Sequence, residues 1–561
     1  MATSSAPWSG GPGGATRRGR WRRIDPLKAL YLVAALYVIA FLLFPLGKVL
    51  VETVGYLFNA ERPLPETLIP YMMRITWNSI RLALITTVIC VAIALPLAIA
   101  IAKLRPPFRA GWIVLLTLPF ITPPFISSFA VIILFGRSGV LTRLMEMVGI
   151  PTFSIYGLNG LVLTQVLHLV PYALLLILAG LQTVPKHTEE AALSMGGTFF
   201  GTMRKIVIPY IYPHILAGAV LVFLSSIGDV GAPLLIGGNY RVLPVEIYSN
   251  FVSFLGDDRI PIIFSAWIIL ITVFMLFFVK RLLDKTEVKH KARRETYSYD
   301  IPWLRRTATV VLSLVTVFFM LPYVAILISS LGTVWSQNLL PNAFTWANYQ
   351  RALSDTQPIM NSLFLVAVIT PICLFLAVML GHMQRSMPKL RWFDYFTLLP
   401  FVIPGVVLGV GIIRAYSGVT LFGIDFTASA LVLIVAVSIR RLAHTMRVLT
   451  AGYARIDQSQ EEASWSLGAS NIRTFWRVVL PQMNATLLAA AVIAVTKVIT
   501  ELGATLLVYP PGWRTMAVYI FFYVSEGQIA RGSAMGVILI VLVGIGTALA
   551  NAISKSRRAA S

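Results

Sequence analysis

The chain has 561 residues, of which 57% are hydrophobic and only 12% are charged, and its mean hydropathy is +0.80. Since a soluble globular domain is about 25% charged, this composition excludes a water-soluble protein and predicts one that spans the lipid bilayer. A formal net charge of +23 would favour nucleic-acid binding in a soluble protein. Here the basic residues lie in short stretches between apolar runs, where they orient membrane helices, so we expect no nucleic-acid partner.

The first 27 residues are rich in Gly, Ser and Ala and then in Arg, a composition typical of a disordered tail. The apolar run at 27–46 is longer than the hydrophobic region of a usual signal peptide, and no clear small-residue cleavage site follows it. We therefore predict that 1–27 is a cytoplasmic tail and that the apolar run is retained as the first membrane helix.

Twelve apolar runs are long enough to cross a membrane, which takes about 20 predominantly apolar residues. A charged segment of mixed sign, 281–306, separates the first six runs from the second six. The sequence thus predicts an all-α membrane protein of about 12 helices in two six-helix domains, 28–280 and 307–553, joined by a cytoplasmic linker and followed by a cytoplasmic tail at 554–561. The runs lie at 28–50, 76–102, 111–135, 157–181, 214–237, 261–280, 307–331, 358–382, 392–416, 428–450, 485–508 and 532–553.

Lys and Arg are concentrated after the even-numbered runs. Because basic loops stay in the cytoplasm, both termini are predicted to be cytoplasmic. An even number of spans per domain inserts both domains the same way up, so the repeat is parallel, and a pathway is expected at the domain interface. Examples are Lys103, Arg105 and Arg109 after the second run, and Arg385, Lys389 and Arg391 after the eighth.

The third run of each domain contains a proline-rich segment, LTLPFITPP at 116–124 in the first domain and LLPFVIPG at 398–405 in the second. Proline lacks a backbone donor and kinks or ends a helix, and neighbouring helices can satisfy the freed backbone groups within a membrane. Both segments therefore predict helix breaks. A gate hinge and a static kink are equally compatible with them.

The polar segments after the fourth and tenth runs repeat one pattern at identical spacing: Glu and two small residues, then Gly, then a branched apolar residue with Pro three positions later. Gly permits a tight bend and Pro ends a helix, so each copy predicts a short helix, a Gly break, and a second helix ending at Pro. Such an element can dock on another protein; an ordinary surface helix is the alternative, which two copies make less favourable. The copies are Glu190, Ala191, Ala192, Gly196, Ile206 and Pro209, and Glu462, Ala463, Ser464, Gly468, Val478 and Pro481.

One carboxylic acid lies within a predicted span at matching places in the two domains, Asp229 in IGDVGAPLLI and Glu501 in ITELGATLLV. An ionisable side chain at membrane depth is costly and faces protein or a water-filled cavity. The two acids could flank a translocation pathway and favour a cation, or each could cap a helix break. Lys497, four residues before Glu501, could pair with it, which weakens the cation-binding alternative in the second domain.

The repeated polar segments resemble the EAA loop of type I ATP-binding-cassette (ABC) importer permeases, and the resemblance covers about 30–553 as two fused permease domains. It implies that both segments are coupling loops that sit in clefts of separate ATPase subunits, expected to be a homodimer. It also implies an extracytoplasmic substrate-binding protein and a multi-pass location in the bacterial inner membrane. Ser464 departs from the second Ala of the family pattern, a small-for-small change.

No phosphate-binding G-x-x-x-x-G-K-[ST] segment occurs in the sequence, so we expect the chain not to hydrolyse ATP. The resemblance assigns ATP and Mg to the partner ATPase, with no cofactor or catalytic residue in this chain. The histidines lack metal-ligand spacing, and no metal site is expected.

Two segments, SSIGDVGAPLLIGG and TELGATLLVYPPGWRTMAVYIF, resemble most closely the ferric-iron branch of these permeases and its relatives, which carry 2-aminoethylphosphonate, polyamines, thiamine or sulfate. Ferric iron is therefore the expected cargo, with the organic substrates and sulfate as alternatives. An ion-coupled secondary transporter also has twelve spans in two parallel halves. It offers no reason for a repeated, Gly-broken polar segment.

Overall fold

The computed structural model describes residues 25–59, 61–253, 256–286, 296–333, 335, 339–421 and 423–560. Within these residues the chain is almost entirely helical, and its only sheet is an antiparallel pair of two-residue strands, β1 (Thr420–Leu421) and β2 (Ile424–Asp425). The all-α prediction is therefore confirmed. The predicted N-terminal tail falls almost entirely on 1–24, and part of the predicted linker falls on 287–295, which lie outside the described residues.

The first half of the chain begins with a long helix in which the π-helical segment η1 (Ile39–Leu43) joins α1 (Pro26–Val38) to α2 (Phe44–Leu57). A second long helix, α3 (Leu68–Ile99), continues into the π-helical η2 (Ala100–Leu104). The remaining elements are α4 (Arg109–Ile121), α5 (Pro124–Phe135), α6 (Val140–Met147), α7 (Leu158–Leu181), α8 (Lys186–Ser194), α9 (Phe199–Thr202), η3 (Met203–Val207), α10 (Ile208–Ile227), α11 (Gly231–Ile236), α12 (Leu243–Val252) and α13 (Arg259–Thr286).

The second half begins at α14 and repeats the order of the long helices, with α15 as an additional short helix and the β1–β2 pair in the place of α6. A short 3-10 helix, η4 (Pro388–Phe393), and a π-helical segment, η5 (Phe475–Val479), lie among its α-helices. These are α14 (Pro302–Leu331), α15 (Ala347–Ser354), α16 (Gln357–Ser386), α17 (Asp394–Val402), α18 (Gly405–Tyr416), α19 (Ala430–Tyr453), α20 (Gln458–Ser466), α21 (Asn471–Thr474), α22 (Leu480–Gln482), α23 (Asn484–Ile499), α24 (Thr505–Val508), α25 (Met516–Ser525) and α26 (Ile529–Ala560).

Nine helices of the described residues are long and apolar enough to cross a membrane, or eleven if each of two bent helix pairs is one span. The prediction of about twelve spans lies close to this range, and every predicted run contains helix. The tenth predicted run is α19, whose apolar sequence is interrupted by Arg440, Arg441 and Arg447. The third is divided between α4 and α5.

Both proline-rich segments break their helices, as the sequence predicts. Thr122, before Pro123, and Ile403, before Pro404, have extended backbones, because the proline ring disfavours the helical conformation of the residue before it. The helices on either side of Ile403 meet at 107°. Each break leaves backbone carbonyls without helical partners inside the bundle.

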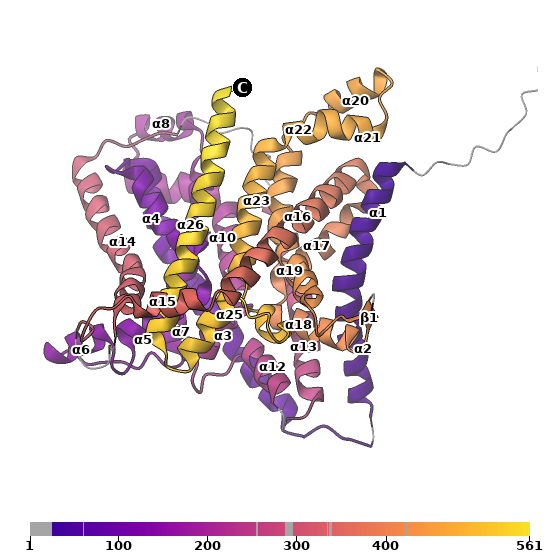
Figure 1. The fold of residues 1–561 in the computed structure, drawn as a ribbon. Coiled ribbons are helices and arrows are strands. Elements are labelled where there is room, and N and C mark those ends of the chain that lie inside the picture. The colour runs from indigo at the N-terminus through magenta and orange to yellow at the C-terminus, as the bar shows by residue number, and fades with distance from the viewer. Residues whose placement is uncertain are drawn as a thin grey trace, which may run out of the picture.

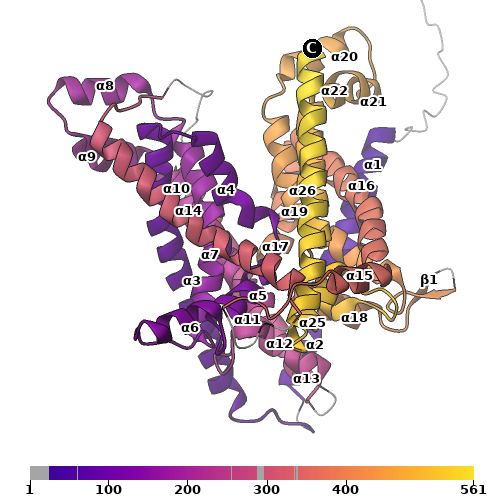
Figure 2. The same ribbon diagram turned by 60° about the vertical axis from the view of Figure 1, so that its left-hand side comes forward.

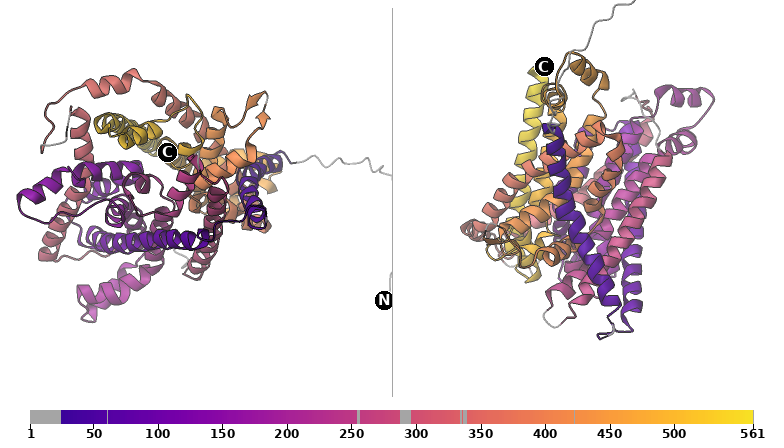
Figure 3. Two further views of the ribbon diagram at one scale, coloured as in Figure 1. Left: turned by 90° about the horizontal axis from the view of Figure 1, so that it is seen from below. Right: turned by 90° about the vertical axis from the view of Figure 1, so that its right-hand side faces the viewer.

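The first helix of each half packs against both halves. The α1–α2 helix contacts α16 and α18 of the second half as well as α13 of its own, and α14 contacts α4 and α5 of the first half as well as α26 of its own. Figure 2 shows α1 beside α16 and α14 crossing the first half near α4 and α10, and Figure 3 shows the α1–α2 helix running along the second half. The halves therefore form one structural unit.

Buried apolar side chains join the halves across these contacts. One cluster contains Tyr31 and Leu42 of the α1–α2 helix together with Leu376 of α16. Another brings Phe125 of α5 together with Ile326 of α14. In a bilayer, where lipid tails are as apolar as these side chains, such contacts stabilise the assembly by close packing rather than by the hydrophobic effect.

Candidate functional site

The two EAA segments, 186–209 and 458–481, lie at one end of the molecule. In Figure 1, α8 of the first and α20 and α21 of the second lie at the same end as the start of α1 and the end of α26. Each segment is a short helix, a turn and a second helix. The turns contain Gly196 and Gly468, which both have φ +83°, a left-handed conformation that favours glycine.

The predicted end of the second helix at proline differs between the two copies. In the second copy the helix ends within two residues of Pro481, and the chain then bends by 73° into α23. In the first copy the prediction is wrong, because Pro209 lies inside a helix that runs without a break from Phe199 to Ile227. A π-helical segment precedes the proline in both copies, η3 two residues before Pro209 and η5 two residues before Pro481. It widens the helix where the proline ring would otherwise clash with the preceding turn, but it does not account for the difference between the copies.

The first EAA segment is anchored by a buried ion pair that the sequence reasoning missed. The Glu189 carboxylate contacts the Lys103 ammonium at the end of the α3–η2 helix, and both side chains are fully buried. Tyr299 Oη donates to Glu189 Oε2 at 3.0 Å, and Tyr299 N donates to Lys103 O at 2.8 Å. Burial and the Glu189 carboxylate raise the pKa of the Tyr299 phenol, so this hydroxyl stays a donor.

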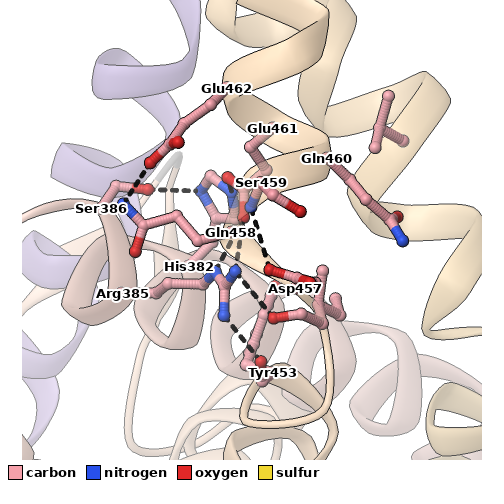
Figure 4. Close-up of polar contacts among 12 residues, drawn as sticks. His382, Arg385, Ser386, Tyr453, Asp457, Gln458, Ser459, Gln460, Glu461 and Glu462 are labelled. Atoms are coloured by element: carbon pink, nitrogen blue, oxygen red, sulfur yellow. Dashed lines mark hydrogen bonds and ion pairs between the residues drawn. The ribbon is translucent and has the colours of Figure 1, made fainter.

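The second EAA segment has an equivalent anchor, shown in Figure 4. Arg385 Nε donates to Glu461 Oε1 at 2.8 Å, and its two terminal nitrogens donate to Tyr453 O at 2.8 Å and Ile456 O at 3.1 Å. Glu461 is buried, and His382 Nε2 lies 3.9 Å from its second oxygen. The donors of a guanidinium lie in one plane and point in several directions, which suits three oxygen acceptors placed around it.

The glutamates singled out from the sequence lie on the outer side of the same helices. Glu190 is half exposed and pairs with Lys186 at 3.5 Å, and Glu462 is exposed and accepts from Gln458 Nε2 at 3.1 Å. The anchoring acids are their immediate predecessors. A doubled Glu in both copies, together with a base at the end of the second long helix of each half, was the sequence signal that could have identified them.

Lys103 and Arg385 both reach their acids, although the number of residues between the start of the helix and the base differs by one. Lys103 lies one residue further from Asn78 than Arg385 lies from Asn361, the matching start points of the two helices. The π-helical turn η2, which contains Lys103, absorbs one extra residue per turn relative to an α-helix. The same anchor geometry is thus kept in both halves.

The other motif residues differ in exposure. Ala192 is buried, and Ile206 and Val478 are half-buried within the π-helical segments η3 and η5. Ala191 and Ala463 are exposed. Next to the turns, Met195 is 81% exposed and Leu467 is 89% exposed, so each turn presents a bare apolar side chain beside its glycine.

The two intramembrane acids line one cavity of about 140 Å³ between the halves. Asp229 lies in the break between α10 and α11, and Glu501 lies in the break between α23 and α24. Each accepts a bond from the backbone of the following short helix: Ala232 N donates to Asp229 Oδ1 at 3.4 Å, and Ala504 N donates to Glu501 Oε1 at 3.0 Å. Both acids therefore cap a helix break, which was one of the two predicted roles.

The partner of Glu501 is Arg441 of α19, not Lys497. The ammonium of Lys497 turns instead toward Tyr172 Oη at 3.2 Å and lies 4.3 Å from the centre of the Phe120 ring. The predicted Lys497–Glu501 pair is therefore wrong. Spacing along one helix does not reveal a competing base on another helix, and the break at Thr500 removes the helical register on which the prediction relied.

Among the described residues, no group of three or more His, Cys, Asp or Glu side chains is arranged to hold a metal ion. The chemistry of the cavity is instead that of charged and hydrogen-bonding groups around a small space.

The sequence matches the family described as binding-protein-dependent transport system inner membrane component, twice, at residues 94–288 and 373–559. The chain belongs to this family. It is a multi-pass membrane permease subunit of an ABC importer, a transport subunit that is not itself catalytic.

Three relatives show how the match is distributed. The chain is 24% identical over 508 residues to the ferric transport system permease protein FbpB of Actinobacillus pleuropneumoniae, covering 87% of this chain and 73% of that protein. It is 32% identical over 244 residues to the putative 2-aminoethylphosphonate transport system permease protein PhnV of Salmonella typhimurium, covering 42% and 90%. It is 29% identical over 179 residues to the molybdenum transport system permease protein ModB of Mycobacterium bovis, covering 31% and 67%.

Proposed function

We propose that this permease imports ferric iron, driven by a separate ATPase that docks on the two EAA segments. The cargo assignment is supported by the relatives. The permeases named for ferric transport align with most of this chain as one continuous match, whereas the relatives named for 2-aminoethylphosphonate align with less than half of it. The fused arrangement of two permease domains is thus shared with the ferric-named relatives.

The observation that carries the ATPase-docking proposal is the pair of exposed apolar side chains beside the two turns, Met195 and Leu467. They occupy the same position of the repeat, immediately before Gly196 and Gly468. Exposed apolar side chains rimmed by polar residues are typical of a protein interface. Two equivalent segments fit two copies of one ATPase subunit, and the buried acid–base anchors couple each docked segment to a membrane helix.

We assign the end of the molecule that carries the EAA segments to the cytoplasm. The basic residues Arg204, Lys205, Arg473 and Arg477 flank these segments, which agrees with the positive-inside rule. The opposite end would then receive cargo from an extracytoplasmic binding protein. In this orientation the start of α1 and the end of α26 are also cytoplasmic.

The test is uptake of ⁵⁵Fe(III) by a strain that lacks the gene, with and without the restored gene and with the ATPase present or deleted. Iron uptake that requires both the gene and the ATPase supports the proposal. Restored uptake of 2-aminoethylphosphonate or putrescine, without iron, would replace the cargo. Uptake that survives loss of the ATPase and collapses with the proton gradient would contradict ATP-driven import.

A further inference from the structure

The cavity between the halves is lined at equivalent positions by both repeats, yet the charges of the two linings differ. The spacing that relates Glu190 to Glu462 also relates Asp229 to Glu501, so each half contributes one acid. The bases come from one half only. The same spacing makes His168, Leu169 and Ser225 the repeat equivalents of Arg440, Arg441 and Lys497, so a neutral side chain in the first half corresponds to each base in the second. All six residues line the cavity.

Ion pairing within the cavity neutralises the charge of only one of the three basic side chains. Arg441 contacts Glu501 directly, and these two charges cancel. Arg440 and Lys497 have no acid within ion-pair distance among the described residues.

Neutral groups hold the two remaining bases in place. Arg440 donates to the carbonyl oxygens of Pro400 and Ile403, which the proline break between α17 and α18 leaves free. Lys497 faces Tyr172 Oη and the Phe120 ring. Carbonyl dipoles and aromatic faces stabilise a cation, but they carry no net charge. The positive charges of both bases are therefore not cancelled by these groups.

The remaining acid, Asp229, is occupied by protein donors. Gln165 Nε2 donates to its Oδ2 at 3.3 Å and Ala232 N to its Oδ1 at 3.4 Å. Gln165 is itself fixed, because Ser226 Oγ and Thr86 Oγ1 both donate to its side-chain oxygen, at 2.6 and 3.1 Å. The carboxylate oxygens are thus engaged by a supported network of neutral donors, which leaves the single charge of Asp229 in place. With Arg441 and Glu501 paired, two bases remain against one acid, and the cavity has an excess of one positive charge.

Two arginines that line the cavity also have hydrogen-bond donors that no described residue uses. The Nε–H groups of Arg440 and Arg441 are buried and have no acceptor among the described residues. Leaving a buried N–H without an acceptor is unfavourable, so an oxygen acceptor arriving in the cavity would be stabilised. Guanidinium groups suit carboxylate, phosphate and phosphonate oxygens, which accept bonds in the plane of the fork.

We propose that the cavity is the passage for a cargo with anionic oxygens. The inference rests on the proposed function and refines it: iron would cross as a complex of net negative charge, not as a bare trivalent cation. Fixed positive charges in a medium of low dielectric constant repel a trivalent ion strongly and attract an anion. Carboxylate, phosphate or phosphonate groups are the chemistry recognised, whether they coordinate iron or belong to a free oxyanion.

The test replaces each unpaired base by its repeat equivalent, Arg440→His and Lys497→Ser, in the complete importer with its ATPase and binding protein. Uptake of ⁵⁵Fe supplied with citrate is expected to fall at least tenfold in the double variant. Arg440→Lys with Lys497→Arg keeps both charges and is expected to retain most of the uptake. Arg447→Gln, on the same helix but outside the cavity lining, is the matched control and should leave uptake unchanged.

Co-purification of the ATPase and ATP hydrolysis stimulated by loaded binding protein confirm that each variant folds and couples. Unchanged or increased iron uptake in a coupled double variant would overturn the inference and leave the ferric assignment standing, since a cationic cargo gains when bases are removed. If the wild-type importer takes up 2-aminoethylphosphonate instead of iron, and this uptake requires both bases, the ferric assignment fails while the anionic passage stands.

Discussion

At the scale of single residues, two neighbouring glutamates in each EAA segment have opposite environments. Glu189 and Glu461 are buried against a base, while Glu190 and Glu462 face outward. Removing one partner of a buried ion pair leaves an uncompensated charge and costs more than the pair itself contributes. Exposed pairs contribute little, because solvent screens them.

Glu189→Gln is therefore expected to destabilise the permease by about 3–5 kcal/mol, since it leaves the Lys103 ammonium buried without its carboxylate. Glu190→Gln, one residue further along, removes only a half-exposed pair with Lys186 and should cost less than about 1 kcal/mol. Thermal unfolding of the purified variants in detergent measures the difference. Equal midpoints for the two variants would contradict the anchoring role of Glu189.

The apolar side chains beside the turns give a second residue-scale prediction. Met195→Asp and Leu467→Asp place a charge on an exposed apolar contact, which opposes burial at an interface. Neither side chain supports the fold, so membrane insertion should be normal while co-purification of the ATPase falls at least tenfold. Undiminished co-purification in the double variant would locate ATPase docking elsewhere on the molecule.

At the scale of elements, the turn of each EAA segment depends on a glycine with positive φ. Apart from the adjoining residues, no atom of the described part of the chain lies within 4 Å of a Cβ placed on Gly196 or Gly468, so a larger residue meets no clash there and the strain lies in the backbone. A left-handed conformation costs a β-branched residue about 1–3 kcal/mol. That strain is enough to change the angle between the two short helices without unfolding the bundle.

Gly196→Val with Gly468→Val is accordingly expected to abolish uptake while leaving the amount of protein in the membrane unchanged. Gly149→Val is the matched control, because Gly149 has φ +74°, equally open surroundings, and a position in the α6–α7 connection. Uptake assays with quantified membrane protein test both. Normal transport by the double variant would refute a coupling role for the segments.

At the scale of the whole molecule, the packing of each first helix against both halves makes each half depend on the other. The α1–α2 helix packs on α16 and α18, and α14 packs on α4 and α5, so neither half buries its own first helix alone. Two separately translated halves, cut within the predicted linker 281–306, are expected to assemble and co-purify from membranes. Recovery of each half without the other would contradict the interdependence that the packing implies.

The architecture was largely predictable from the sequence because hydropathy and Lys/Arg placement are local signals. Helix breaks before Pro123 and Pro404 were also predictable, since the constraint acts on the preceding residue. That Asp229 and Glu501 cap helix breaks was one of two alternatives that the sequence left open. The roles of Glu189, Glu461 and Arg441 were not predicted, because each depends on a partner from a helix distant in the chain. The prediction at Pro209 was wrong because a proline near the start of a helix does not have to end it: Pro209 and Pro481 both follow a π-helical segment, yet only the helix of Pro481 stops.

The first helices of the two halves also cross-connect the two EAA segments to the membrane bundle. The first segment, through Glu189, is bonded to Tyr299, which lies just before α14 of the second half. The second segment is bonded through Asn471 to Asp25, which lies just before α1 of the first half. A displacement of either segment would therefore be transmitted to the leading helix of the opposite half. The two halves are accordingly expected to move together even when a force acts on one segment alone.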